Sequence, residues 1–257
     1  MKRIISLAII ALLTLTFLVG CGGDGGGDSN PTTAAKQKLK VGTSTGFEPF
    51  EFKEGAKYVG IDIDIANEIA KDLDKIIDFV DGKFEDLTDD GGLIAAGAVD
   101  FGIAAISKTN ERAEYMDFSD PYFDSTVVII VRKDDIKIKG EDDLVGKKIG
   151  VQSGTTSAGI AEDIIKDAEI KGFDEYAQAA VQLRNGGIDA ILMDEKAANS
   201  FINEYSDTKI LDEELAHEVY CIAVKKGDTE LLDKINKTLK RIKEDGTLDN
   251  IIKKYDK

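Results

Sequence analysis

Apolar side chains recur along this chain at two spacings, one typical of amphipathic helices and one typical of buried strands. Between Ile61 and Leu73 an aliphatic residue recurs at every fourth position, which places an apolar stripe along one face of a helix. Related patterns predict helices over residues 158–166, 196–204 and 229–243, and a short one near Ile251. A shorter helix is expected from Thr88 to Ala96, although two adjacent glycines within it each lower helical stability by about 1 kcal/mol relative to alanine.

Short apolar runs alternate with these helices. They predict strands over residues 39–42, 76–80, 99–105, 127–132, 148–152 and 188–193, and extended chain over residues 50–52. β-Branched residues dominate the run at 127–132, as expected for a strand that is covered on both faces. Strands that alternate with helices are typical of an α/β protein whose sheets are mostly parallel and flanked by helices, and we predict this fold class.

The N-terminal segment has a different pattern. Two basic residues precede an apolar run over residues 4–19, which is short for a membrane-spanning helix and of the right length for a secretory signal. The run ends in Leu-Val-Gly-Cys at residues 18–21, which resembles the lipobox of bacterial lipoproteins, where the signal is removed and the thiol of Cys21 is acylated. The alternative is a short membrane anchor with an incidental cysteine.

These observations divide the start of the chain into two parts. Residues 1–20 are predicted to be a lipoprotein signal peptide that directs export. Residues 21–38 contain mostly Gly, Ser, Asp, Asn and Thr, with almost nothing to bury, and are predicted to be a flexible lipid-anchored tether. The folded part is therefore expected outside the cytoplasm, held to a membrane through Cys21.

Composition excludes several classes of protein. Among 257 residues, 49 Asp+Glu outnumber 33 Lys+Arg, and the net charge of −16 would repel a nucleic acid. One histidine and two cysteines disfavour a zinc site of His and Cys ligands and a disulfide framework, and we expect neither a metal nor a cofactor. Cys221, left without a partner once Cys21 is acylated, is expected to be a small buried apolar residue.

Four positions carry candidate chemistry, each with a simpler structural alternative. Arg112 follows Thr109, a helix-capping residue, and is either a clamp for a carboxylate or an exposed arginine paired with a nearby acid. The loop at 153–157 is either an anion site at a helix N-terminus or an ordinary capped turn. Asp194 ends a strand and either accepts an ammonium group or caps a helix. Phe47 covers a ligand with its ring or belongs to the core.

One motif points to a different chemistry and lacks its structural context. Residues 42–46 match the G-x-S-x-G pattern of serine hydrolases, with Ser44 as nucleophile, and Asp194 and His217 follow in the hydrolase order. A nucleophile of this kind lies directly before a helix, whereas the Phe-Glu-Pro-Phe segment that follows is predicted to be extended. A serine hydrolase is therefore not expected.

Taken together, these segments resemble the extracytoplasmic solute-binding proteins of amino-acid ABC transporters, the family of the histidine, lysine/arginine and glutamine receptors. The resemblance covers about Leu39 to Lys257 and is carried by strings such as VGTSTGFEPFEF, YVGIDIDIANEIAKDL, SKTNERAEYMDFSDPYF, DLVGKKIGVQSGTT and GGIDAILMDE. It implies a non-enzymatic receptor that captures a polar amino acid, basic ones included, and delivers it to an ABC permease and its ATPase, with a monomer as the expected state.

The resemblance also implies roles for individual residues. Arg112 would clamp the ligand carboxylate with help from Ser107 and the backbone N–H of Thr156. Asp194 and the Ala105 carbonyl would accept the ligand ammonium. The remaining positions would cover the ligand or face its side chain: Phe47, Ser44, Gln152 and Met193. Phe84 is a further pocket wall, although the stretch between Phe84 and Asp100 is longer than the family pattern and its register is open.

The fold implied is a type II periplasmic-binding-protein fold with two lobes joined by two hinge strands. Its lobes would comprise residues 39–122 plus 221–257 and residues 127–215, with the hinge at 123–126 and 216–220. A ligand bound between the lobes shifts an open-to-closed equilibrium, and the permease recognises the closed form.

Two alternatives stay open. The periplasmic cyclohexadienyl or prephenate dehydratases resemble the same family, and Glu48 is the one obvious general acid in the implied pocket. A sensor domain acting through a separate signalling partner is the other alternative.

Overall fold

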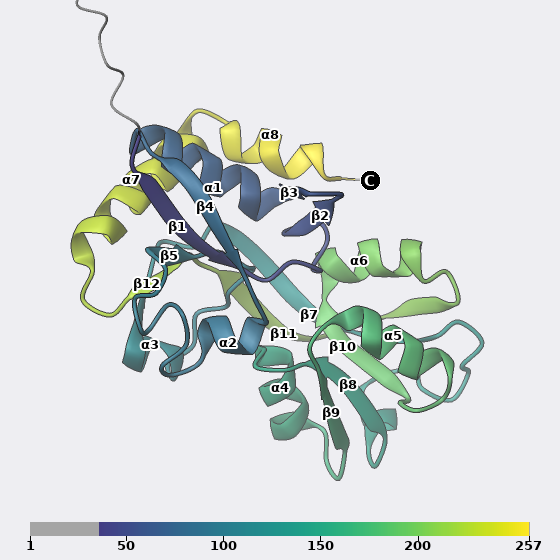
Figure 1. The fold of residues 1–257 in the computed structure, drawn as a ribbon. Coiled ribbons are helices and arrows are strands. Elements are labelled where there is room, and N and C mark those ends of the chain that lie inside the picture. The colour runs from purple at the N-terminus through teal and green to yellow at the C-terminus, as the bar shows by residue number, and fades with distance from the viewer. Residues whose placement is uncertain (1–35, 257) are drawn as a thin grey trace, which may run out of the picture. The chain divides into compact units, whose positions relative to one another are not determined.

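The computed structural model describes residues 36–256, and the predicted signal peptide, Cys21 and most of the tether lie outside this range. The chain from Lys36 onward is one compact unit that holds two five-stranded sheets, and we call each sheet with its helices a lobe (Figure 1). No helix within residues 36–256 is both long enough and apolar enough to cross a bilayer.

The first lobe is built on a sheet with the strand order β4-β1-β5-β12-β6. Its strands are β1 (Lys38–Thr43), β4 (Ile76–Asp81), β5 (Phe101–Gly102), β6 (Met116–Phe118) and β12 (Ala223–Lys225). β1 pairs in parallel with both β4 and β5, and β12 pairs antiparallel with β5 and β6. A small hairpin of β2 (Phe52–Glu54) and β3 (Lys57–Val59) follows β1.

The second lobe repeats this arrangement with the order β11-β7-β10-β8-β9. Its strands are β7 (Phe123–Arg132), β8 (Lys148–Gln152), β9 (Glu169–Phe173), β10 (Ala190–Asp194) and β11 (Thr208–Tyr220). β8, β9 and β10 are parallel to one another, and β7 is antiparallel to β10. Because β11 is in turn antiparallel to β7, it runs in the same direction as β8, β9 and β10. The predicted α/β class is confirmed, although the sheets are mixed, because two of the four strand pairings in each are antiparallel.

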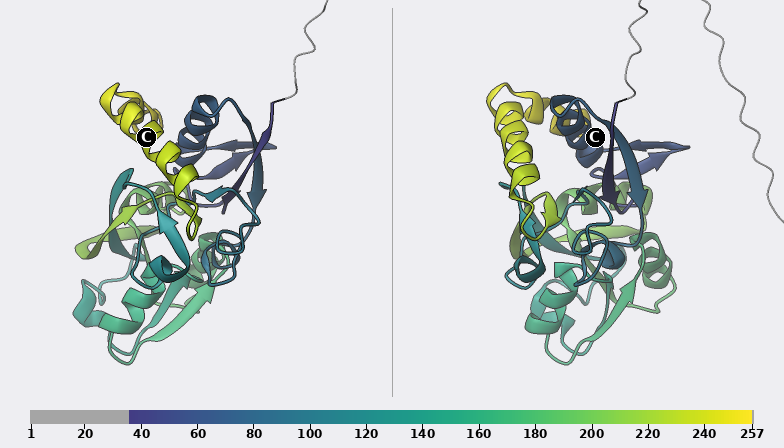
Figure 2. Two further views of the ribbon diagram at one scale, coloured as in Figure 1. Left: turned by 90° about the vertical axis from the view of Figure 1, so that its left-hand side faces the viewer. Right: turned by 60° about the vertical axis from the view of Figure 1, so that its left-hand side comes forward.

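Helices flank both sheets (Figure 2). In the first lobe these are α1 (Ile61–Asp72), α2 (Phe84–Thr88), α3 (Arg112–Tyr115), α7 (Thr229–Glu244) and α8 (Thr247–Lys254). In the second lobe they are a short 3-10 helix (Glu141–Leu144), α4 (Thr156–Ile164), α5 (Tyr176–Arg184) and α6 (Glu195–Glu204). The C-terminal helices α7 and α8 pack against α1, so the end of the chain completes the lobe in which the described chain begins.

Most predicted elements between 61 and 254 are present, but the helix predicted over 88–96 is wrong. Thr88 ends α2 instead of starting a helix, because its hydroxyl donates to the carbonyl of Phe84 at 2.9 Å, four residues earlier. The two glycines that follow lie in turns, and Gly91 has a φ of 84°, a conformation that does not continue a helix. The strand predicted over 99–105 is likewise reduced to the two residues of β5.

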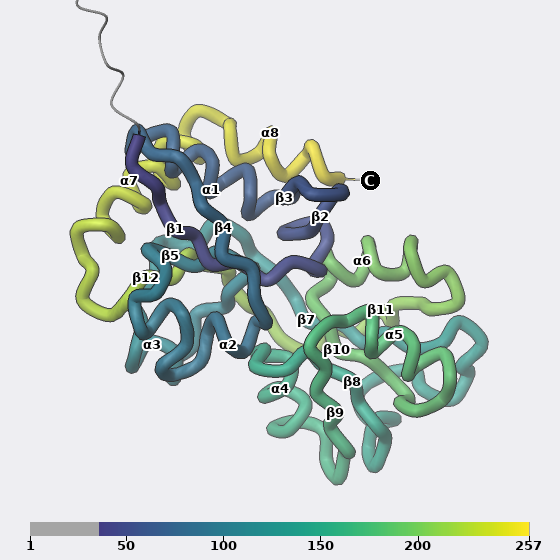
Figure 3. The backbone as a smooth tube through the Cα atoms, in the orientation of Figure 1, coloured from purple at the N-terminus to yellow at the C-terminus, as the bar shows by residue number. Residues whose placement is uncertain are grey.

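Two long strands pass between the lobes (Figure 3). The chain enters the second lobe through β7 and returns through β11, and the two strands pair antiparallel, with Phe123 opposite Tyr220 and Thr126 opposite His217. The exact bounds of the lobes and hinge stay a prediction. Cys221, just after β11, is a fully buried free thiol whose pKa burial raises to about 11, as its predicted role as an apolar residue requires.

Candidate functional site

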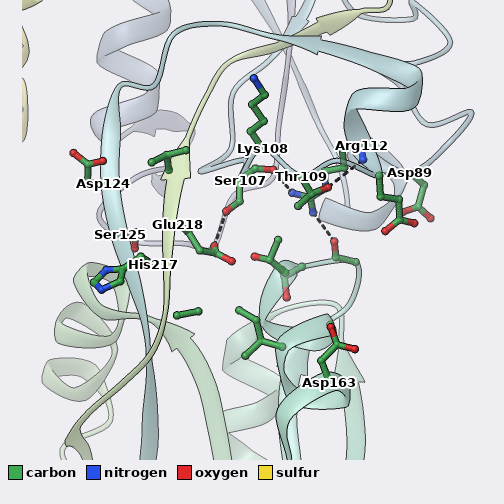
Figure 4. Close-up of a pocket in the computed structure, with 18 of the residues that line it drawn as sticks. Asp89, Ser107, Lys108, Thr109, Arg112, Asp124, Ser125, Asp163, His217 and Glu218 are labelled. Carbon is green, nitrogen blue, oxygen red and sulfur yellow. Dashed lines mark hydrogen bonds between the residues drawn. The ribbon is translucent and has the colours of Figure 1, made fainter.

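A cleft of about 1090 Å³ opens between the two lobes (Figure 4). The first lobe contributes Ser107 and the following residues up to Tyr115, and the second lobe contributes the turn before α4 and its first two turns. The crossing strands β7 and β11 supply Ser125 and Glu218. The cleft is thus lined by both lobes and by the strands that join them.

Arg112 lines this cleft from the first lobe and is only 6 % exposed. The N–H of Arg112 donates to the hydroxyl of Thr109 at 3.1 Å, which is the predicted cap of the short helix α3. Its guanidinium donates to the Ser107 carbonyl at 2.7 Å and across the cleft to the Gly154 carbonyl at 2.7 Å. Burial lowers the pKa of this group, and no ion pair to it occurs within residues 36–256. The guanidinium also lies over the ring of Phe84, 5.3 Å from its centroid, so two carbonyl dipoles and an aromatic face surround this buried positive charge.

The N-terminus of α4 lies directly opposite Arg112. Thr156 is the first residue of this helix, and no side chain caps its free N–H groups. Gly154 precedes it with a φ of 75°, and a Cβ at this position would lie 2.9 Å from the Cα of Glu85 in the first lobe. Glycine therefore allows the two lobes to approach closely beside Arg112, and an arginine and a helix N-terminus together suit an anionic group.

Asp194 is the buried acid of the second lobe, at the end of β10 and 7 % exposed. Its Oδ1 accepts a hydrogen bond from the Ser125 hydroxyl at 2.9 Å. Burial, and secondarily the charge of Glu218, raise its pKa to about 7. Asp194 occupies the N-cap position of α6, as the alternative interpretation expects, but its side chain makes no capping hydrogen bond.

Of the nine predicted site residues, Ser107, Arg112 and Thr156 line this cleft, and the other six, Asp194 and Ala105 included, lie outside its lining. Phe47 stacks on Tyr176 of the second lobe, with ring centroids 5.8 Å apart, and lines a cavity of about 170 Å³ with Met193 and Glu48. Ser44 lines another cavity, of about 270 Å³. The side-chain amide of Gln152 donates to the Asp174 carbonyl at 3.0 Å. The closed arrangement of side chains divides the predicted site into separate spaces.

Ala105 has an unusual backbone conformation for a residue with a side chain. Its φ is 48°, and its N–H donates to the buried carboxylate of Asp62 at 2.7 Å. The hydroxyl of Tyr122 donates to the other oxygen of Asp62 at 2.8 Å. The hydrogen bond from Ala105 to Asp62 thus fixes the start of the loop that leads from Ala105 to Ser107.

The hydrolase motif is not assembled. Ser44 lines the small cavity beside Asp174, whereas His217 is exposed and lines the large cleft. Ser44 and Asp194 share no cavity within the part of the chain that the structure describes.

Comparison with known proteins decides the family. The model of the bacterial extracellular solute-binding proteins, family 3, matches residues 39–257. This chain belongs to that family. Among curated relatives, a probable histidine-binding protein of Campylobacter jejuni is 33 % identical over 100 % of this chain and 99 % of its own length. The glutamine-binding protein of a Bacillus subtilis ABC transporter is 32 % identical, with 99 % and 97 % covered.

Solved structures agree with this assignment. An ancestral arginine-binding protein bound to arginine is 39 % identical over 86 % of this chain and 99 % of its own, with a TM-score of 0.79. An ancestral amino acid-binding protein, described as a precursor of cyclohexadienyl dehydratase, is 35 % identical over 86 % and 96 %, with a TM-score of 0.78. The type II periplasmic-binding-protein fold predicted for this solute-binding protein is confirmed, and the family is one of binding proteins, not enzymes.

Sequence reasoning missed three residues beside the predicted positions. Tyr176 faces Phe47 from the second lobe, Asp62 holds Ala105, and Glu218 accepts a hydrogen bond from Ser107 at 2.6 Å. Asp62 was visible in the sequence as an acid within an apolar helical segment. Glu218 lies in a run of charged residues that gave no strand signal, so nothing in the sequence distinguished it from a solvated surface acid.

Proposed function

We propose that this chain is the receptor of an ABC importer that binds a polar amino acid between its two lobes and presents it to the membrane permease and its ATPase. The observation that carries the proposal is a pair of opposite buried charges on the two lobes. Arg112, without an ion pair among the described residues, faces the uncapped N-terminus of α4, and Asp194 is buried on the other lobe. These groups suit the carboxylate and the ammonium of one α-amino acid.

The proposed site comprises the nine positions named from the sequence. Arg112 and the N-terminus of α4 at Thr156 bind the carboxylate, Asp194 and the Ala105 carbonyl bind the ammonium, and Phe47 closes over the ligand. The names of the relatives, which include histidine-, glutamine- and arginine-binding proteins, support the class of ligand and point to no single amino acid. Ser44, Gln152 and Met193 are proposed to face the ligand side chain.

A thermal-shift screen tests this proposal. Residues 36–257, refolded to remove retained ligand, are screened against the twenty amino acids, ornithine, cystine and prephenate. This segment forms one compact unit, and solved relatives match 85–86 % of the chain. At a ligand concentration of 100 times Kd, binding adds about 2.7 kcal/mol to the free energy of unfolding, a shift of a few degrees. A response to one or a few amino acids supports the receptor, and a response to prephenate alone supports a dehydratase-like role.

We also propose that the exported chain is held to the outer face of the membrane through a lipid on Cys21. The sequence at 18–21 and the polar tether after it support this anchor. Incorporation of radiolabelled palmitate into the chain, lost in a Cys21→Ser variant, is the expected result. Retention of the Cys21→Ser variant in the membrane fraction with an unprocessed N-terminus would favour a membrane-spanning anchor instead.

A single elution volume for a monomer in size-exclusion chromatography is expected for residues 36–257.

A further inference from the structure

Ser107 is held at both ends, and its side chain faces the cleft beside Arg112 (Figure 4). Its carbonyl accepts from the guanidinium of Arg112 at 2.7 Å. Its hydroxyl donates to Oε2 of Glu218 at 2.6 Å, a short distance typical of a hydrogen bond to an ionised acceptor. Ser107 is only 5 % exposed, so this geometry is enclosed by the protein.

The bond to Glu218 fixes what Ser107 can offer a ligand. A serine hydroxyl has one proton to donate and two lone pairs that accept. Because the proton is committed to Glu218, the hydroxyl has none left for a ligand carboxylate and can only accept. Its natural ligand partner is therefore a donor, and the donor of an α-amino acid is its ammonium group. This reverses the role implied from the sequence, where Ser107 assists Arg112 in binding the carboxylate.

Glu218 also stands close to the other acid of the site. It lies opposite Ser125 in the pairing of β11 with β7, and the hydroxyl of Ser125 donates to Asp194 at 2.9 Å. Tyr220, two residues along β11, donates to the same Ser125 hydroxyl at 3.3 Å. The negative charge of Glu218 raises the pKa of Asp194 and opposes loss of the proton from Arg112. Glu218 and the Ser107 hydroxyl thus line the cleft, and Ser125 connects the strand of Glu218 to the buried Asp194.

We propose that Glu218 is a positioning residue for ammonium recognition, which acts by orienting the Ser107 hydroxyl as an acceptor for the ligand ammonium. This inference rests on the proposed amino-acid site and adds Glu218 to the nine positions of that site. Glu218 touches Ser107 and need not touch the ligand. Its contribution should consequently depend on the ligand having an α-ammonium and on Ser107 having a hydroxyl.

The test compares pairs of probes that differ only in the α-amino group. These are L-histidine with imidazolepropionate, L-glutamine with 4-carbamoylbutanoate, and L-arginine with 5-guanidinopentanoate, and titration calorimetry uses each pair whose amino acid binds. Glu218→Leu keeps bulk and removes the acceptor. We expect it to weaken binding of the amino acid roughly tenfold and binding of the deaminated probe less than about twofold. Glu218→Gln, whose amide oxygen still accepts, should recover part of the loss.

A double-mutant cycle with Ser107→Ala provides the second readout and does not need the weak deaminated probes. In the Ser107→Ala background, Glu218→Leu should cause little further loss, because the hydroxyl it orients is gone. The matched control is Glu214→Gln, which removes an exposed acid from the same strand outside the cleft and should leave affinity unchanged. Melting temperatures of each variant without ligand separate folding effects from binding effects.

Three outcomes overturn the inference. Equal losses for the amino acid and its deaminated partner would make Glu218 a general structural or electrostatic residue. An undiminished effect of Glu218→Leu in the Ser107→Ala background would show that it does not act through Ser107. Absence of amino-acid binding by the parent chain would instead overturn the proposed function, and this inference with it.

Discussion

Arg112 and Asp194 are both buried and come from opposite lobes, yet the protein relieves their burial in different ways. Arg112 keeps its charge, because a guanidinium does not lose its proton in a protein, and two backbone carbonyls accept from it. Asp194 accepts a hydrogen bond from the Ser125 hydroxyl, and burial raises its pKa to about 7, so a proton neutralises part of its population near neutral pH. The charge of Arg112 is compensated by neighbouring groups such as the two carbonyl dipoles, whereas the charge of Asp194 is compensated in part by protonation.

This difference indicates which half of the site depends more strictly on a ligand. A buried carboxylate can take up a proton when no cation is present, whereas Arg112 can only retain or exchange its acceptors. The Gly154 carbonyl belongs to the opposite lobe, so this hydrogen bond of Arg112 joins the two lobes. If a ligand carboxylate replaces this carbonyl as the acceptor for Arg112, the N–H groups at the N-terminus of α4 would face that same carboxylate.

Removal of Arg112 should have the largest effect. Arg112→Ala is expected to weaken amino-acid binding by about 2 to 5 kcal/mol, near the upper end, because the ligand carboxylate would then be buried without its counter-charge. Titration calorimetry with the amino acid found in the screen measures this loss. Arg112→Lys should recover only part of it, since an ammonium cannot make the two parallel bonds of a guanidinium. Unchanged affinity of the Arg112→Ala variant would remove Arg112 from the site.

Asp194→Ala should weaken binding by about 2 kcal/mol or somewhat more, a smaller loss than at Arg112. The physical reason is that the proposed ammonium site retains the Ala105 carbonyl and the Ser107 hydroxyl as acceptors. The same titration measures the effect, with Asp212→Ala, an exposed acid on β11, as the matched control. A loss larger than that of Arg112→Ala would show that binding depends more strictly on Asp194 than on Arg112.

The sequence predicted the Arg112 half of the site better than its surroundings, for physical reasons. Arg112, Thr109 and the turn before α4 are local features whose capping and chain-reversal signals can be recognised within a few residues. Glu218 acts across the fold, on a residue 111 positions earlier, and no local pattern encodes such a contact. The closed packing of Phe47 on Tyr176, which separates the cavities, is equally non-local.

The same distinction applies to the fold. The helix α1 was predictable because its apolar stripe extends over three turns, and six of its residues with hydrocarbon side chains are buried: Ile61, Ile63, Ile65, Ala66, Ile69 and Ala70. The strand β11 was not predictable from its own pattern, and only its last five residues, 216–220, were expected as a hinge strand, from the family resemblance. It lies at the edge of its sheet, where acidic residues such as Glu213 and Glu214 remain exposed. An edge strand with a charged face has no apolar alternation to detect.

The dependence of affinity on pH tests the proton on Asp194. Because the proposed ammonium contact needs the carboxylate form, affinity should fall as pH falls below about 7, by up to about tenfold per pH unit. The same raised pKa means that this group stabilises the ligand-free fold below about pH 4 and that this contribution is lost as pH rises through about 7. Titrations between pH 5.5 and 8.5, roughly the span around this pKa, measure the first effect.

Asp194→Asn provides the control for this pH dependence. Asparagine keeps the shape but does not titrate, so the variant should bind weakly with an affinity that hardly changes over the same range. A wild-type affinity that stays constant across this range would show that Asp194 carries no proton in the ligand-free site. Its burial would then be compensated by the hydroxyl of Ser125 and by solvent, and the contrast with Arg112 would disappear.

The smallest effect is expected from one of the two ion pairs that join the lobes outside the site, the other being Lys196 with Asp256. Lys83 of the first lobe pairs with Asp174 of the second at 2.9 Å, and both side chains are about half exposed. Because this contact exists only when the lobes are closed, Lys83→Ala should shift the equilibrium toward the open form and weaken ligand binding by roughly two- to threefold, most clearly at low salt. Lys38→Ala is the matched control, since Lys38 pairs with Asp78 within the first lobe at 3.1 Å and should not affect closure. Equal affinities for both variants would mean that the Lys83–Asp174 ion pair does not contribute to closure of the lobes.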